Sequence, residues 1–153
     1  MEGRKYPLGI QTFENVIKGN YVYVDKTALV YQVVHENKYC FLSRPRRFGK
    51  SLLVTTLQAY FEGKKELFEG LAIEQLEQEW ISYPVIHLDL SKGKFYDLDS
   101  LHATLNSLLV EYEKRYSLEV ESERAYNVRL QNIIEAAYAQ TGKEVVVLID
   151  EYD

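Results

Sequence analysis

The chain has 153 residues, of which 46% are hydrophobic and 27% charged, and its formal net charge is −5. This length suggests one domain with a substantial core, and the acidic balance gives no support for a general nucleic-acid or anionic-membrane binder. The single cysteine, Cys40, cannot form an internal disulfide, and no apolar stretch is long enough to cross a bilayer. We therefore expect a cytoplasmic protein without a membrane anchor.

The first part of the chain predicts a helix, a strand and a second helix. Residues 12–18 place apolar side chains on one helical face, and Gly19 can close this helix. The alternating sequence NYVYV, residues 20–24, predicts a short strand. Asp25 can cap the next helix. The apolar stripe of that helix consists of Leu29, Val30, Val33 and Val34. We expect residues 1–37 to form a small N-terminal appendage.

The middle of the chain predicts a buried strand followed by a strong helix. Residues 39–42 are apolar throughout, and a helix starting near Lys50 and stopping near Gly63 follows them. The apolar positions of this helix are Leu53, Leu57, Tyr60 and Phe61. Residues 64–83 predict short helical pieces, and residues 84–90, PVIHLDL, predict a strand.

Two further helices and a strand complete the pattern. After a loop at residues 91–99, Asp99 or Ser100 can cap a helix. Its apolar residues are Leu101, Leu105, Leu108, Leu109 and Tyr112. A polar stretch, 117–124, separates it from a helix that Thr141-Gly142 ends. The apolar residues of this second helix are Leu130, Ile133, Ile134 and Ala137. Residues 144–149 then predict a buried strand.

Apolar strands that alternate with amphipathic helices indicate an α/β fold, in which helices cover both faces of a mostly parallel sheet. We therefore predict a three-layer sandwich over residues 38–153, with the appendage at its edge. The chain ends just after its most hydrophobic segment, VVVLIDEYD. From this we expect a fragment whose sheet is incomplete at the C-terminus.

The segment SRPRRFGKSLL, residues 43–53, ends in the signature of a phosphate-binding loop. The usual pattern is G-x-x-x-x-G-K-[ST] between a strand and a helix, and Gly49, Lys50 and Ser51 fit it. Backbone amides and the helix dipole then surround phosphate, while the lysine and the hydroxyl contact phosphate and Mg²⁺. Arg44 replaces the first glycine, and Pro45 removes a backbone donor. A bare GKS is a weak signal.

Asp150 and Glu151 strengthen this interpretation, because they follow the apolar strand at the far end of the chain. A P-loop enzyme needs an aspartate at a strand tip to hold hydrated Mg²⁺, and a glutamate that polarises the attacking water. Taken alone, a lysine such as Lys50 is usually just solvated. An acidic pair such as Asp150-Glu151 is usually just the polar end of a strand. The two halves together favour a nucleotide site.

With these motifs, the chain resembles the AAA-ATPase-like family of bacterial and archaeal proteins, in which the ATPase domain often precedes a restriction-endonuclease-like domain. The resemblance rests on YVDKT (23–27), LSRPRRFGKSLL (42–53), YFEGKKELFEGLAI (60–73), YPVIHLDLS (83–91) and VVVLIDEYD (145–153). It implies a P-loop NTPase core whose cofactors are ATP and Mg²⁺. It also implies a downstream effector domain as a partner in the longer chain.

The resemblance and the chemistry assign the same roles. Lys50 and Ser51 would bind phosphate and Mg²⁺, Asp150 would hold the Mg²⁺, and Glu151 would be the catalytic base, with Lys50 as the second catalytic residue. The candidate nucleotide-binding residues are Arg46, Arg47, Phe48, Gly49, Lys50, Ser51 and Leu52. Arg46 and Arg47 either replace lost backbone donors with guanidinium contacts or remain solvated, and the sequence leaves both readings open.

Two functions remain in view. In the first, the chain is the front part of a Mg²⁺-dependent ATPase that drives an attached effector domain. In the second, it is a catalytically weak nucleotide-binding or structural interaction module, which Arg44 and Pro45 favour. Because later strands, a γ-phosphate sensor and an arginine finger are missing, we expect weak binding, poor hydrolysis and self-association of this segment through an exposed sheet edge.

Other patterns have simpler explanations. Asp25 is better explained as a helix cap than as part of an active site, and a role near the nucleotide base comes only from the resemblance. His87 and Asp89 share a strand face without a third metal ligand. The thirteen tyrosines sit mostly among aliphatic neighbours, which indicates packing rather than stacking on nucleic-acid bases.

Overall fold

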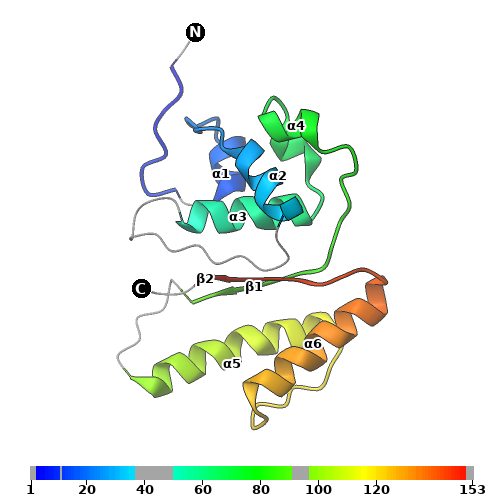
Figure 1. The fold of residues 1–153 in the computed structure, drawn as a ribbon. Coiled ribbons are helices and arrows are strands. Elements are labelled where there is room, and N and C mark those ends of the chain that lie inside the picture. The colour runs from blue at the N-terminus through cyan, green and yellow to red at the C-terminus, as the bar shows by residue number, and fades with distance from the viewer. Residues whose placement is uncertain (1–2, 11, 37–49, 91–96, 151–153) are drawn as a thin grey trace. The chain divides into compact units, whose positions relative to one another are not determined.

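The computed structural model describes residues 3–10, 12–36, 50–90 and 97–150 (Figure 1). Over these ranges the chain forms α-helices, one short 3-10 helix and two β-strands. The chain divides into two compact units, Met1–Ser82 and Tyr83–Asp153. The first unit is helical in its described part, and the second contains a sheet with two helices.

The first unit is built around the helix α3, Lys50–Phe61. Two helices precede it, α1 (Phe13–Lys18) and α2 (Thr27–Glu36). The 3-10 helix η1 (Lys65–Phe68) and the helix α4 (Ala72–Leu76) follow it. The contacts join α1 to α3 and to η1, and α2 to α4.

Aromatic and aliphatic side chains from all of these helices form the core of the first unit. Phe13 and Phe68 are fully buried, and their ring centroids lie 4.9 Å apart. Tyr23 packs edge-on against Phe13, and Trp80 lies 5.2 Å from Phe68. The remaining buried members of this cluster are Val30, Ala59, Tyr60, Leu67 and Ile73. Burial of this many large side chains stabilises helices that are too short to persist alone in water.

The second unit contains two parallel strands, β1 (Val85–Asp89) and β2 (Val146–Asp150). They pair in register from Val85 with Val146 to Asp89 with Asp150. The helices α5 (Leu98–Arg115) and α6 (Tyr126–Thr141) connect the two strands and pack together against the sheet (Figure 1). Their shared core consists of Ile86, Leu88, Leu109, Tyr112 and Ile133.

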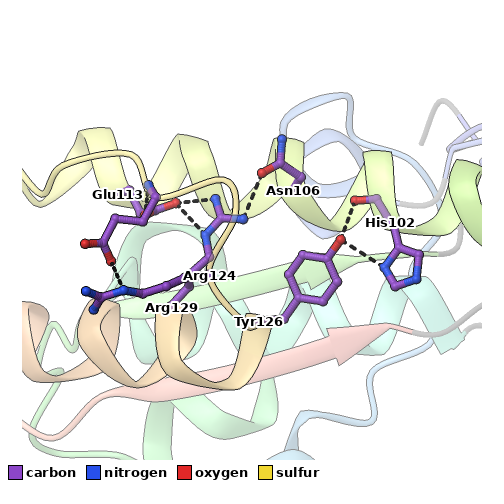
Figure 2. A network of polar contacts seen from close by, with 7 residues as sticks. His102, Asn106, Glu113, Arg124, Tyr126 and Arg129 are labelled. Atoms are coloured by element: carbon purple, nitrogen blue, oxygen red, sulfur yellow. Dashed lines mark hydrogen bonds and ion pairs between the residues drawn. The ribbon is translucent and has the colours of Figure 1, made fainter.

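Polar contacts also join α5 to α6, as Figure 2 shows. Arg129 on α6 donates hydrogen bonds to Glu113 and Asn106 on α5. At the other end of the interface, the Tyr126 hydroxyl donates to the carbonyl oxygen of His102, 3.1 Å away. The packing of the two helices is therefore fixed by specific hydrogen bonds as well as by apolar contact.

The helices expected from periodicity are present. The helix expected from Lys50 is α3, and those expected after residues 100 and 125 are α5 and α6. Gly142 ends α6 with a left-handed φ of 68°, which is the conformation that a glycine adopts without strain. The strands at 84–90 and 144–149 correspond to β1 and β2, and their parallel pairing confirms an α/β fold. The strand expected at 39–42 lies outside the described residues.

Three local predictions were wrong. Residues 20–24 form no strand, because Val22 donates a single backbone bond to Lys5 and the segment pairs with no ladder among the described residues. The cap of α5 is Asp97, whose carboxylate accepts from the Ser100 amide, so the helix begins earlier than expected. The strand β2 is only partly buried, and Ile149 is 51% exposed.

The prediction of the apolar stripe on α2 was wrong for two of its four residues. Val30 is buried at 4% exposure and Val34 packs against the core, whereas Leu29 is 59% exposed and Val33 is 37% exposed. Residue Tyr31 takes their place against the core. In the described part of the chain, no helix combines the length and apolarity that crossing a membrane requires.

Candidate functional site

The helix α3 begins at Lys50, where the sequence predicted the end of a phosphate-binding loop. Ser51 and Leu52 lie in its first turn and are half-buried. The first amides of any helix lack acceptors within the helix, and they form the positive end of its dipole. The start of α3 therefore has the electrostatic character that a phosphate group requires. Arg46, Arg47, Phe48 and Gly49 lie outside the described residues.

Two threonines further along α3 form hydrogen bonds back to this first turn. The Thr55 hydroxyl donates to the carbonyl oxygens of Ser51 and Leu52, at 3.1 and 3.0 Å. The Thr56 hydroxyl donates to the Leu52 carbonyl oxygen at 2.6 Å. Thr56 is 1% exposed. The carbonyl groups of the candidate phosphate-binding turn are therefore held by side chains as well as by the helix itself.

The same two threonines contact the N-terminal segment. The Phe13 amide donates to the Thr55 hydroxyl at 3.0 Å, and the Thr56 side chain acts on the Tyr23 hydroxyl, where it opposes the effect of burial on the pKa of Tyr23. Burial raises the pKa of Tyr23 to about 12. Neither threonine was among the site residues predicted from the sequence. The available signal was two adjacent hydroxyl residues inside the apolar run LLVTTL.

The motif YVDKT has a structural explanation in the first unit. One oxygen of Asp25 accepts from the Thr27 amide at 2.9 Å and from the Thr27 hydroxyl at 2.6 Å. Its other oxygen accepts from the Ala72 amide at 2.8 Å, at the start of α4. The buried Thr27 hydroxyl in turn accepts from the Ile73 amide at 3.1 Å. Asp25 is confirmed as a helix cap, and it serves two helices rather than one.

These contacts also set the charge state of Asp25. Burial by itself would raise the pKa of this carboxyl group, but hydrogen bonds from Thr27 and Ala72 outweigh burial and hold the pKa below its usual range. The carboxylate therefore stays ionised, and it is fully used in joining α2 to α4. Lys26, which lies between Asp25 and Thr27 in the sequence, is exposed.

Asp150 is the last residue of β2 and is 2% exposed. It lies opposite Asp89 in the parallel register, so two carboxylate residues end neighbouring strands. The carboxyl ends of parallel strands are the usual location of ligand sites in α/β proteins. The Leu90 amide donates to the Asp150 carbonyl oxygen at 2.7 Å, which extends the pairing by one residue. Glu151 lies outside the described residues.

The two halves of the predicted site belong to different compact units. Ser51 and Leu52 lie in the first unit, and Asp150 lies in the second. Lys50 is the first residue of α3, and Asp150 is the last residue of β2.

The donor chemistry of these residues suits magnesium. A serine hydroxyl and a carboxylate are hard oxygen ligands of the kind that Mg²⁺ prefers, with water and phosphate oxygens completing its octahedral coordination. Among the residues that the structure describes, no three or more His, Cys, Asp or Glu side chains gather into a metal-binding group. A P-loop magnesium site needs no such group of protein side chains, because phosphate supplies ligands.

A hollow of about 410 Å³ lies elsewhere, beside the turn between α5 and α6. It is lined by Glu113, Leu118, Glu119, Glu121, Asn132, Glu135, Ala136 and Ala139. Its carboxylates would repel the phosphate groups of a nucleotide. This hollow is therefore not a candidate for the nucleotide site.

The comparisons with known proteins agree with the motifs. A family model described as "AAA-ATPase_like: Predicted AAA-ATPase" matches residues 7–153. A curated relative from Azotobacter chroococcum mcd 1, described as "Uncharacterized protein in vnfD 5'region", is 38% identical over 154 residues. That alignment covers 100% of this chain and 30% of the relative. No solved structure matches the chain. The chain belongs to the AAA-ATPase-like family.

Proposed function

We propose that this chain binds ATP with Mg²⁺ and hydrolyses it, as part of a P-loop NTPase domain with a three-layer sandwich fold. The observation that carries the proposal is where each motif half falls in its own secondary-structure element. The GKS sequence leads directly into α3, and the apolar strand β2 ends at Asp150. Membership in a family described as predicted AAA-ATPases supports the same function.

The proposed roles follow from chemistry. The first amides of α3 and the Lys50 ammonium group would hold the phosphates, with Arg46 and Arg47 adding guanidinium donors. Phe48, Gly49 and Leu52 would shape the loop around the phosphate chain. Bound magnesium would neutralise charge on the β- and γ-phosphate oxygens.

The acidic pair would complete the site. The Ser51 hydroxyl and the Asp150 carboxylate would hold the magnesium ion, either directly or through its water molecules. Glu151 would accept a proton from the attacking water as general base. In the longer protein, hydrolysis would drive a change in a downstream effector domain.

Arg44 and Pro45 favour a second candidate function. They replace the first glycine of the loop and remove a backbone donor, so the loop provides fewer amide contacts than the usual one. A loop of this kind could retain binding while losing efficient turnover. The second candidate is therefore a nucleotide-gated interaction module without significant hydrolysis.

A thermal-shift titration of the full-length protein with ATP and Mg²⁺ tests the binding site. Ligand at about 100 times its dissociation constant should add roughly 2.7 kcal/mol of stability if only the folded state binds. Lys50→Ala should abolish the shift, and Lys65→Ala, which changes an exposed lysine on η1, should leave it intact. An unchanged shift in Lys50→Ala would rule out this phosphate site.

Phosphate release then distinguishes the two candidate functions. For an ATPase, Glu151→Gln should retain the thermal shift and lose hydrolysis, because the carboxylate acts on water rather than on the nucleotide. Equal, background-level release from the wild type and Glu151→Gln, with binding intact in both, would favour the interaction module.

A further inference from the structure

The helix α1 lacks a cap of its own. Thr12 occupies the cap position without a side-chain hydrogen bond to the helix. The Phe13 amide instead donates to Thr55 on α3, 42 residues away in the chain. A six-residue helix is unstable in isolation. Whether α1 forms is therefore determined by the burial of Phe13 and Val16 and by the hydrogen bond to Thr55.

The Thr55 hydroxyl has two functions at once. Its oxygen accepts from α1, and its proton is directed to the carbonyl oxygens of Ser51 and Leu52. One side chain therefore connects the first amide of α1 to the first turn of α3. Hydrogen bonds arranged in series polarise each other, so a change at one end is felt at the other.

Thr56 provides a second, parallel connection. Its hydroxyl donates to the Leu52 carbonyl oxygen, and its side chain acts on the Tyr23 hydroxyl, just beyond α1, where it opposes the effect of burial on the pKa. Tyr23 packs against Phe13 at a centroid distance of 5.4 Å. Two adjacent threonines thus join the same turn of α3 to the same N-terminal segment. A threonine hydroxyl can bond to a carbonyl oxygen in the preceding turn of its own helix without any partner elsewhere. Thr55 and Thr56 also interact with Phe13 and Tyr23.

We propose that Thr55 is a positioning residue that couples the docking of α1 to the first turn of α3, so that α1 tunes phosphate binding there. The part that concerns phosphate rests on the proposed function. Coupling between two sites is reciprocal in free energy. A nucleotide that fixes the first turn of α3 must therefore stabilise the docked state of α1. Loss of α1 docking must in turn weaken nucleotide binding.

Hydrogen exchange of the full-length protein without nucleotide tests the coupling itself. Thr55→Val keeps the shape of the side chain and removes the hydroxyl, whereas Thr55→Ser keeps the hydroxyl. Exchange of the α1 amides should be about five- to tenfold faster in Thr55→Val, which corresponds to one lost hydrogen bond. Thr55→Ser should restore the wild-type rate. Thr141→Val, which removes a comparable back-bond to Ala137 on α6, should leave α1 unchanged.

A second variant, in α1, shows whether loosening of α1 affects the first turn of α3. Val16→Ala loosens α1 from a distance, because Val16 is 1% exposed and packs in the core. It should accelerate exchange of the amides at 54–56, which bond back to the first turn of α3, in the wild-type background and have little effect there when Thr55 is already valine. An equal acceleration in both backgrounds would overturn the coupling.

Addition of Mg²⁺ and ADP tests the consequence for the site. In the wild type, exchange should slow in α3 and in α1 together. In Thr55→Val it should slow in α3 alone, and the dissociation constant should rise several-fold, with recovery in Thr55→Ser. A wild-type response in α3 with none in α1 would overturn the inference. A complete absence of response in the wild type would overturn the proposed function, while the nucleotide-free experiments still decide the coupling.

Discussion

Glu113 and Arg129 form an ion pair that is closed to solvent, with side-chain exposures of 3% and 0%. One oxygen of Glu113 accepts from Nε of Arg129 at 3.1 Å and from a terminal nitrogen of the same side chain. Its other oxygen accepts from the Glu121 amide at 3.2 Å. The third guanidinium nitrogen of Arg129 donates to Asn106 at 2.8 Å (Figure 2). Every side of the pair is therefore hydrogen-bonded, as buried charges require.

Glu113→Gln should destabilise the protein strongly, because it leaves the Arg129 charge buried without its counter-ion. The expected loss is about 3–5 kcal/mol in the free energy of unfolding, measured by urea denaturation. The double replacement Glu113→Leu with Arg129→Met should recover much of this loss, since it removes both charges. Glu111→Gln on the same helix breaks an exposed pair with Arg115 and should cost about 0.5 kcal/mol or less. Equal effects of the Glu113 and Glu111 changes would contradict this account.

Asp25→Ala should destabilise the first unit, because it removes caps from α2 and α4 together. Two lost caps predict a decrease of about 1–3 kcal/mol, measured by urea denaturation. The pKa of Asp25 is lowered in the folded state, so its contribution is present above the pKa of the unfolded chain and is lost as the pH falls through the folded pKa. The variant should therefore lose less stability on acidification than the wild type does.

Lys26→Ala is the matched control for this prediction. Lys26 is adjacent in the chain, and it is exposed. Its removal should change the free energy of unfolding by no more than about 0.5 kcal/mol. Similar losses for both variants would show that the segment, rather than the carboxylate, is responsible.

The long helices could be predicted because each carries its own periodic pattern. Leu109 and Ile133 lie in the core as their spacing requires. Residues 20–24 carried an equally clear local pattern, but a strand also needs a partner, and the pattern of Tyr and Val does not specify one. Leu29 was assigned to the core because it is apolar, although its neighbour Val30 is buried and Leu29 is exposed.

The candidate site could be predicted only as far as its motifs reach. Lys50 and Asp150 follow from short sequence patterns, and their places at a helix start and a strand end agree with those patterns. The contact between Phe13 and Thr55 joins residues 42 positions apart through a backbone amide. No composition or spacing rule indicates which amide a threonine hydroxyl will accept from, because tertiary packing decides it.

Tyr23→Phe should make the protein less sensitive to alkali. The pKa of Tyr23 is raised by burial from 10.0 to about 12, so the folded state keeps its proton where the unfolded chain loses it. The stability that this provides is fully present below pH 10 and is lost as the pH rises towards 12. Because part of the ring is open to solvent, we expect a loss of up to about 2 kcal/mol in the wild type.

Urea denaturation between pH 9 and pH 12 provides the measurement. The variant should be less stable than the wild type near neutral pH, since it lacks the polar interaction of the Tyr23 hydroxyl with Thr56. The difference between the two proteins should then shrink as the pH rises. Parallel pH profiles would exclude Tyr23 as the titrating group.

Tyr112→Phe should open the side of β1 that faces away from β2 in the described part of the sheet. The Tyr112 hydroxyl accepts from the His87 amide at 2.8 Å and donates to the His87 carbonyl oxygen at 3.1 Å. These are the backbone groups that a neighbouring strand would otherwise use, because the residues on either side of His87 pair with β2. Removal of one oxygen atom leaves both groups without this partner, at an expected cost of about 1–3 kcal/mol.

A strand edge with unsatisfied backbone groups also attracts other strands. Sedimentation of Tyr112→Phe at increasing concentration should therefore show more self-association than the wild type, at urea concentrations where both remain folded. Tyr138→Phe, which changes a ring that is 57% exposed on α6, should sediment as the wild type does. If Tyr112→Phe lost stability without added association, the hydroxyl would be needed to dock α5 on the sheet and not to protect its edge.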